Sequence, residues 1–456
     1  MTGGTGGPGP LVRWRERLRP AERPPGGSAL LRNGRILAAS AVLAAGLGAL
    51  FWLLAARWFS AATVGRSYAL LSAAMLLATL GSLNLGDVLI RFLPTAGERG
   101  RWLVVRCYAI AAGTSAAVAV GFVLLAKWIS PGLTELREPW SAVLFIVATG
   151  GYAVFVLQDG ALTGLRRPGW VLAENFVFAV AKVLVLAVCA ALAVASGILL
   201  SWAVGLVLAV LLANSVLFAR ALPEARPVRP SRDDDRAATR TAARDDDRPG
   251  GQPQRMARYA AADYVGQLGQ TAVAKSLPLL VLARLGAEQT AYYSLAYLVT
   301  DTLYQAAYSM GQSLTVEGAA EPGRLAEHAR RMLRHTAALI TPAALVTVAA
   351  APWILRLFGA DYAEHGTTVL RLMALSALPN VLFGVAVHVA RVRQALVFLT
   401  GLQLAFAALL LLLVLVLMPR HGLTGVGVAW LATSTVLALA LAVTARRWLS
   451  GGPQHP

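Results

Sequence analysis

Charged residues are scarce in this chain. Asp, Glu, Lys and Arg make up 14% of its 456 residues, whereas 57% are hydrophobic, and the mean hydropathy is +0.61. A soluble protein of this length needs a largely polar, charged surface. The composition therefore argues against a soluble enzyme.

Cysteine and several functional motifs are also scarce or missing. Cys107 and Cys189 are the only cysteines, and both lie in apolar stretches where a lone cysteine behaves as a small apolar residue. We therefore expect no disulfide framework and no metal site. The sequence has no nucleotide-binding glycine loop, so we expect no cofactor and no direct use of ATP. Residues 1–33 lack the apolar core of a signal peptide, so the first apolar stretch should remain in the protein.

The chain does contain twelve apolar stretches, each long enough for a helix to cross a hydrocarbon core of about 30 Å. They cover residues 34–58, 65–90, 103–127, 140–159, 169–192, 197–219, 257–284, 289–316, 335–357, 366–390, 394–418 and 423–445. Six precede and six follow a segment rich in Arg and Asp. We therefore predict an all-α polytopic membrane protein of about twelve transmembrane helices in two six-helix lobes. The predicted divisions are a cytoplasmic basic tail (1–33), an N-terminal lobe (34–219), a linker (220–256), a C-terminal lobe (257–445) and a cytoplasmic tail (446–456).

The central segment 220–256 has mixed charge and almost no apolar residues, so burial cannot offset the entropy of ordering it. We interpret it as a disordered cytoplasmic linker. Its aspartate triplets, Asp233–Asp235 and Asp245–Asp247, could bind a divalent cation, but they lack the turn glycine and spaced oxygen ligands of a calcium loop.

The net charge of +18 is distributed unevenly along the chain. With the N-terminus placed inside, the inner segments hold 31 Lys and Arg residues and the outer segments hold 7. The positive-inside rule then predicts a plasma membrane protein with both termini in the cytoplasm. The basic excess is mainly a topology signal, with attraction to anionic lipids as a second effect, and it does not indicate nucleic-acid binding.

Polar residues inside the predicted spans carry the functional signal, because ionisable groups at membrane depth are costly and usually face the protein interior or water. In the seventh stretch, Asp263, Gln267 and Gln270 are spaced by four and three, which places them on one helical face. Asp301 and Gln305 begin a similar polar stripe in the eighth. Both stripes predict a polar cavity.

Buried cations form a second group. Lys182 lies near the middle of the fifth stretch and Lys275 lies inside the seventh, where neither can easily reach the headgroups. A structural alternative for Lys182 is an ion pair with Glu174, two turns away. Arg371 and Glu174 lie near span ends, where structural and functional roles are equally open. Asp87 and Arg91, four residues apart, predict a local ion pair.

Several longer runs resemble a known family. They are the run from Phe51 to Arg57, the runs Leu85-Gly86-Asp87 and Ile90-Arg91-Phe92-Leu93-Pro94, the run Gln158-Asp159-Gly160-Ala161-Leu162-Thr163-Gly164-Leu165-Arg166-Arg167, and the run from Leu357 to Tyr362. Together they resemble the bacterial polysaccharide and oligosaccharidyl-lipid flippases of the multidrug/oligosaccharidyl-lipid/polysaccharide (MOP) exporter superfamily. The likeness covers nearly the whole chain.

The resemblance implies two six-helix lobes arranged as a V, with alternating access to a central cavity. It also implies flipping of undecaprenyl-pyrophosphate-linked oligosaccharide to the outer leaflet for surface polysaccharide synthesis. Cationic residues would hold the pyrophosphate, with Lys182, Lys275 and Arg371 as candidates, and Gln267, Gln270 and Gln305 would complete the substrate site. Asp263, Asp301 and Glu174 are candidates for coupling to H⁺ or Na⁺, and Arg91 for recruiting the lipid. Glycosyltransferases or a glycan polymerase are the candidate protein partners.

Two other functions remain open from the sequence. A cation-coupled multidrug exporter of the same superfamily often carries an acidic residue in its first span, and residues 34–59 have none. Asp263 and Asp301 could supply that charge instead. A membrane glycosyltransferase or polymerase would need a large outer catalytic loop with paired carboxylates, whereas the outer loops here are short. We therefore expect a transporter and not an enzyme.

The predicted topology can be tested with reporter fusions at Gly250 and at the C-terminus. We expect a cytoplasmic signal from both fusions, because the charge bias places both positions inside. An extracytoplasmic signal from either fusion would contradict the topology.

Overall fold

The computed structural model of this chain describes residues 46–129, 132–165, 167–222, 252–320, 324–445 and residue 448. Every regular element within these residues is helical. The first half contains a helix over Gly46–Trp58, then α3 (Ala61–Gly81), α4 (Leu85–Phe92), α5 (Gly100–Ile129), α6 (Pro139–Gly164), α7 (Pro168–Ala191) and α8 (Gly197–Val216). The second half contains α11 (Gln252–Leu285), α12 (Ala287–Ala320), α13 (Leu325–Phe358), α14 (Ala360–Val392) and α15 (Leu396–Val443).

The helix α15 is 48 residues long and combines the last two predicted spans. Its backbone leaves the helical region at Gly422, where φ is 56° and ψ is −138°. Glycine adopts a positive φ at little cost because it has no Cβ. The described helices therefore confirm the predicted all-α fold of twelve helices.

The second predicted span, 65–90, is wrong in its extent, because α3 ends at Gly81 and a separate short helix, α4, follows. Leu83 and Asn84 between them have positive φ values of 49° and 57°, which end the first helix. The predicted ion pair between Asp87 and Arg91 is also absent. Asp87 instead accepts a hydrogen bond from Asn84 Nδ2 at 3.0 Å, because Asn84 precedes α4 and faces its first turn.

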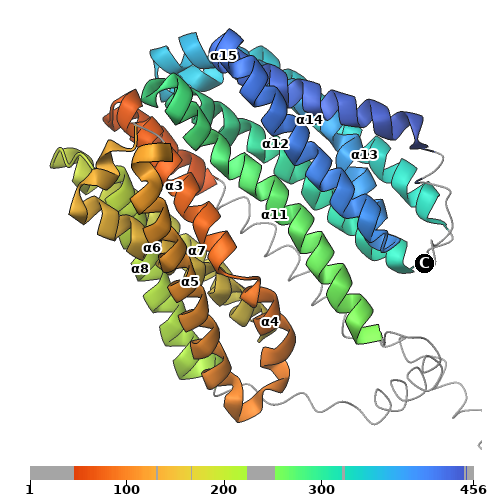
Figure 1. Ribbon diagram of the computed structural model, residues 1–456, viewed down its shortest axis with the longest axis horizontal. Helices are drawn as coiled ribbons and strands as arrows, with labels where there is room; N and C mark the ends of the chain where they lie inside the picture. The colour runs from red at the N-terminus through yellow and green to blue at the C-terminus, as the bar shows by residue number, and fades with distance from the viewer. Residues whose placement is uncertain are drawn as a thin grey trace, which may run out of the picture.

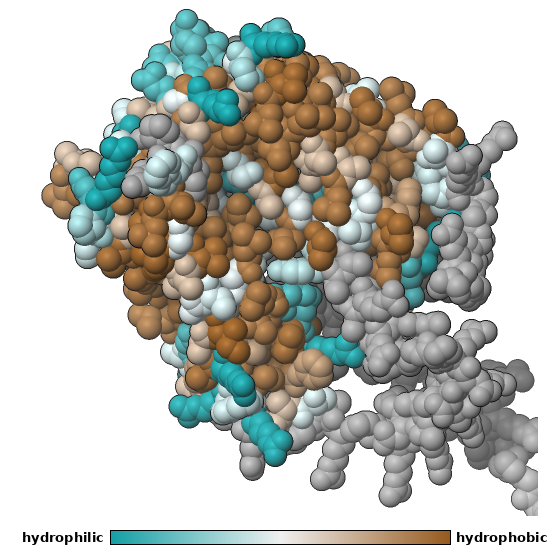
Figure 2. All heavy atoms as spheres, viewed as in Figure 1, coloured by the Kyte–Doolittle hydropathy of each residue, from teal (hydrophilic) through white to brown (hydrophobic). Residues whose placement is uncertain are grey.

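Eight of the described helices are long and apolar enough to cross a membrane. The helices α11 and α12 are not among these eight, although 34 residues each give them a length of about 50 Å. Their polar residues lower their hydropathy. Large apolar side chains such as Leu124, Leu184 and Val397 point outward, and brown, hydrophobic atoms cover much of the described surface in Figure 2. An apolar surface of this extent suits a lipid environment.

The predicted linker and tails lie mostly outside the described residues. Residues 252–256, which the sequence assigned to the linker, are helical because α11 begins at Gln252. The aspartate triplets and the tail 1–33 are not described. In the tail 446–456, the structure describes Trp448, whose indole nitrogen donates a hydrogen bond to the Leu441 carbonyl at 2.9 Å.

The helices form two groups (Figure 1). The first contains α3 to α8 and the helix Gly46–Trp58, whose Phe51 and Trp52 contact α7 and α3, and the second contains α11 to α15. The groups meet along α3, which packs against α11 and α12, and beyond the C-terminal end of α3 they spread apart. Arg57 helps to join them, since its Nε donates to the Leu357 carbonyl at 2.7 Å and its Nη2 to the Arg356 carbonyl at 3.3 Å. The largest apolar core contains residues of both groups, including Phe51, Leu206 and Tyr293. The arrangement agrees with the predicted V.

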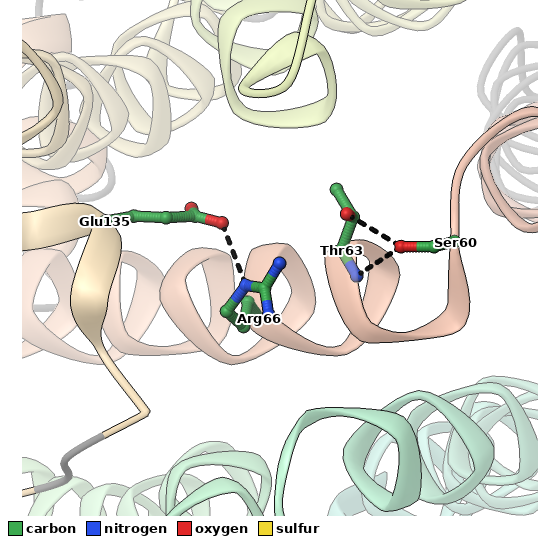
Figure 3. Close-up of polar contacts among 4 residues, drawn as sticks. All are labelled: Ser60, Thr63, Arg66 and Glu135. Carbon is green, nitrogen blue, oxygen red and sulfur yellow. Dashed lines mark hydrogen bonds and ion pairs between the residues drawn. The ribbon is translucent and has the colours of Figure 1, made fainter.

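The start of α3 is held by polar contacts (Figure 3). The Ser60 hydroxyl accepts a hydrogen bond from the Thr63 amide at 3.3 Å, which caps the helix. One turn later, Arg66 Nε lies 3.2 Å from Glu135 Oε1, in the short helix Thr134–Arg137 before α6. Burial raises the pKa of the Glu135 carboxyl, and the hydrogen bond from Arg66 acts in the opposite direction.

Gly65 allows α3 to approach α12 closely, so its substitution tests the junction between the two groups. A Cβ at this position would collide with the Ala287 carbonyl and would lie 2.8 Å from the Ala291 amide nitrogen. We expect Gly65→Ala to destabilise the protein by about 1–3 kcal/mol through overpacking, measured as a lower melting temperature in detergent. The control is Gly113→Ala in α5, where a Cβ meets no atom within 4 Å. Equal melting temperatures for the two variants would contradict the tight junction.

Candidate functional site: a polar cavity in the second helix group

A cavity of about 410 Å³ lies among α11, α12, α14 and α15. Its polar lining consists of amides, hydroxyl groups, one carboxylate and one guanidinium, and its apolar lining is mainly aromatic. The polar lining residues are Gln267, Gln270, Thr271, Tyr297, Asp301, Tyr304, Gln305, Tyr308, Asn380, Arg391 and Gln403, and the aromatic ones without a hydroxyl are Phe383, Phe406 and Trp430. These groups can bind a molecule that has both hydroxyl groups and apolar faces.

The helix α12 supplies the acidic side of the cavity. Asp301 is half-buried, and Tyr297 and Gln305, one turn before and one turn after it, direct polar groups toward its carboxylate. Tyr304 is held in place by its hydroxyl, which lies 2.5 Å from Ser376 Oγ and 3.3 Å from the Met373 carbonyl oxygen on α14. The polar residues of α12 share one helical face because of their spacing, and Tyr304 on that face contacts α14.

The helix α14 supplies the basic side. Arg391 Nη1 donates a hydrogen bond to the Tyr308 hydroxyl at 3.1 Å, and the Tyr308 ring packs against His388 with centroids 5.3 Å apart. Sequence reasoning missed Arg391, which it counted among the arginines of an inner loop. A usable signal was present, because His388 and Arg391 are three residues apart and therefore share a helical face.

Aromatic rings and a buried amide on α15 close the cavity. Trp430 stacks on Tyr304 with centroids 5.6 Å apart and packs against Tyr297 at 5.9 Å. Gln403 is 1% exposed, and its Oε1 accepts no hydrogen bond from the described residues. A buried acceptor without a donor is costly, so Gln403 is suited to a ligand that brings a hydroxyl or amino group.

Four of the predicted site residues meet in this cavity, namely Gln267, Gln270, Asp301 and Gln305. Lys275 does not line it, but its positive charge acts on the Asp301 carboxylate without a direct ion pair. Asp263 lies in α11, and its side chain is outside the described residues. The predicted stripes on the seventh and eighth spans are thus brought together at Gln267, Gln270, Asp301 and Gln305.

Lys182 lies in the first helix group and is 9% exposed. Its Nζ is 5.0 Å from the ring centroid of Phe51 and 4.7 Å from that of Phe178. Aromatic faces attract a cation through their quadrupole, which partly compensates for its burial. No ion pair joins Lys182 to Glu174 within the described residues, so the predicted pairing of these two residues is wrong.

The remaining predicted residues lie elsewhere. Arg371 is exposed, and its Nε donates to the Val348 carbonyl on α13 at 3.1 Å, so it does not line the cavity. Arg91 is exposed on α4, with its guanidinium 5.6 Å from the Phe92 ring centroid. Glu174 is fully buried between α6 and α7, within the first helix group.

The charge balance at Asp301 gives a test of the cavity. Asp301→Asn removes the negative charge that acts on Lys275, and Lys275→Met removes the positive charge that acts on Asp301, so the effects of the two substitutions on stability should be coupled. A double-mutant cycle should give a coupling energy of about 0.5–3 kcal/mol. Glu364→Gln, which changes an exposed carboxylate on α14, is the matched control and should have little effect. Strictly additive losses would mean that the two charges do not interact.

Comparisons with known proteins agree on the fold. Residues 271–395 match the MatE family model. A solved multidrug resistance MATE family transporter of the MOP superfamily, in an inward-facing conformation, has a TM-score of 0.64 at 13% identity, covering 89% of this chain and 94% of the other. The MATE multidrug transporter DinF-BH in complex with R6G has a TM-score of 0.61 at 15% identity, covering 95% and 100%.

The lipid II flippase MurJ, in an inward closed conformation, has a TM-score of 0.58 at 11% identity, covering 90% of this chain and 87% of that one. A search of curated protein sequences finds no significant match. At these identities, the likeness to solved structures establishes the fold and leaves the substrate open. The chain is a multi-pass membrane protein with the MATE/MOP fold of two six-helix lobes.

Proposed function

We propose that this protein is a transporter that flips an undecaprenyl-pyrophosphate-linked oligosaccharide from the inner to the outer leaflet by alternating access. The observation that carries the proposal is the lining of the cavity, where four glutamines and one asparagine lie beside six aromatic rings. Side-chain amides both donate and accept hydrogen bonds, as sugar hydroxyl groups do. Aromatic faces can pack against the apolar faces of sugar rings.

The positive charges in and near the cavity support a substrate with a phosphate-containing head group. Arg391 is the guanidinium that lines it, and Arg can bind phosphate oxygens in a bidentate manner. Lys275 lies behind the lining, and Lys182 offers a second buried cation in the first helix group. Because Arg371 points away from the cavity, Arg391 replaces it in our proposal. Arg91, exposed on α4, remains a candidate for recruiting the lipid from an anionic leaflet.

The arrangement of the two helix groups supports alternating access. They are joined near Gly65 and Arg57 and spread apart toward the N-terminal end of α11, which the charge bias places at the cytoplasmic side. The cavity in this arrangement would be loaded from inside. Opening toward the outside requires the junction along α3 to separate, and a coupling ion, H⁺ or Na⁺, would supply the energy through Asp301 or Asp263.

One observation favours a second function, the export of organic cations coupled to an ion gradient. Asp301 lines the same cavity as the rings of Tyr297, Tyr304 and Trp430, and a cavity with both a carboxylate and aromatic rings is suited to a lipophilic cation. Two of the similar solved structures are described as multidrug transporters. A drug exporter needs no guanidinium in its cavity. The effect of replacing Arg391 on transport therefore distinguishes the two functions.

Neutralising the proposed phosphate-binding cations tests the flippase function. We expect Arg391→Gln, and separately Lys182→Gln, to cause lipid-linked oligosaccharide to accumulate on the cytoplasmic leaflet and surface polysaccharide to fall by about tenfold or more. Arg391→Gln loses a charge-assisted contact with the pyrophosphate worth about 1.5–3 kcal/mol. Lys182→Gln removes the buried cation of the first helix group. The measurement is the amount of lipid-linked oligosaccharide in each leaflet, in cells with normal protein abundance.

Arg371→Gln is the matched control, since it removes an arginine of α14 that does not line the cavity, and it should retain flipping. Lys182→Gln should not be rescued by Glu174→Gln, because the two side chains are not paired. Normal flipping in Arg391→Gln together with lost drug resistance in Asp301→Asn would overturn the flippase function in favour of the exporter.

A further inference from the structure

A second cluster of polar groups lies in the first helix group, away from the cavity. Asp159 and Gln158 are near the end of α6, Glu174 is in the second turn of α7, and Tyr108 approaches from α5. Gln158 is 0% exposed and Glu174 is 1% exposed. The Gln158 side-chain nitrogen donates to Glu174 Oε2 at 3.5 Å, and the carboxyl groups of Asp159 and Glu174 are within hydrogen-bonding reach of each other.

The hydrogen bonds of this cluster do not balance if both carboxyl groups are ionised. An ionised carboxylate only accepts hydrogen bonds, so two of them in contact repel and cannot bond to each other. Three buried oxygens, Gln158 Oε1, Asp159 Oδ1 and Glu174 Oε1, accept no hydrogen bond from the part of the chain that the structure describes. One added proton turns a carboxylate into a donor and removes the repulsion.

No ion pair within the described residues balances the charge of the two carboxyl groups. The titratable groups that act on the pair are Tyr108 on α5 and Tyr152 on α6, both neutral at physiological pH. The described residues contain no group of three or more His, Cys, Asp or Glu side chains able to hold a metal ion.

We infer that Asp159 and Glu174 form a proton-binding site, in which one shared proton ties α6 to α7. Loss of that proton leaves two buried like charges in contact, and these push the two helices apart. The site is separate from the cavity and does not depend on which substrate the cavity binds. It couples proton binding to the packing of the first helix group.

Infrared difference spectroscopy on the full-length protein in nanodiscs tests the site directly. We expect the carbonyl stretch of a protonated carboxylic acid at neutral pH, its disappearance in alkaline buffer, and its absence from Glu174→Gln. The control Asp87→Asn, at an exposed carboxylate of α4 that accepts a hydrogen bond from Asn84 Nδ2, should keep the band. A wild-type spectrum without the band, or a band that survives in Glu174→Gln, would overturn the proposal.

Hydrogen exchange provides the second measurement. Glu174→Gln imitates the protonated carboxyl, so the amides of α6 and α7 in this variant should exchange equally slowly in neutral and alkaline buffer, whereas those of the wild type should exchange faster in alkaline buffer. Faster exchange that follows the replacement of sodium by choline, and not the pH, would identify a sodium site and contradict a proton site.

Discussion

The organisation of this protein depends on one constraint, which is that polar side chains at membrane depth must be enclosed by protein. The helices α11 and α12 carry too many polar residues to face lipid, so α14 and α15 cover them and supply matching groups. The resulting cavity has a carboxylate on α12 and a guanidinium on α14, with amides and aromatic rings between them. The polar cavity therefore forms because these four helices pack with their polar faces toward one another and away from lipid.

The first helix group meets the same constraint in other ways. Lys182 is placed between two aromatic rings, and Glu174 is placed beside Gln158 and Asp159. The two groups join where residues allow close contact, as at Gly65 against α12, and where Arg57 bonds to carbonyl groups at the end of α13. The polar cavity lies in the second group, and the buried cation and the carboxyl pair lie in the first. Transport by this fold would require the two groups to move relative to each other.

Much of the fold could be predicted from the sequence, because apolar length and charge bias are local properties. The polar stripe was predictable for the same reason, since the spacing of Asp301 and Gln305 defines a helical face. The partners of that face were not predictable, because Arg391, Gln403 and Trp430 come from helices whose neighbours no local pattern specifies. The break between α3 and α4 was missed because Leu83 and Asn84 adopt positive φ without a glycine. Lys182 was assigned the wrong alternative partner because Phe51 reaches it from another helix.

Photo-cross-linking from the cavity tests the central claim most directly. A photoreactive phenylalanine analogue at Phe383, which lines the cavity, should capture a lipid-linked oligosaccharide in cells, and the same analogue at Phe176, exposed on the surface of α7, should capture only bulk lipid. Mass spectrometry of the adduct identifies the bound molecule. A saccharide-bearing adduct at Phe383 alone is the result that our account predicts. Capture of an organic cation at Phe383, or equal capture of the saccharide lipid at both positions, would contradict it.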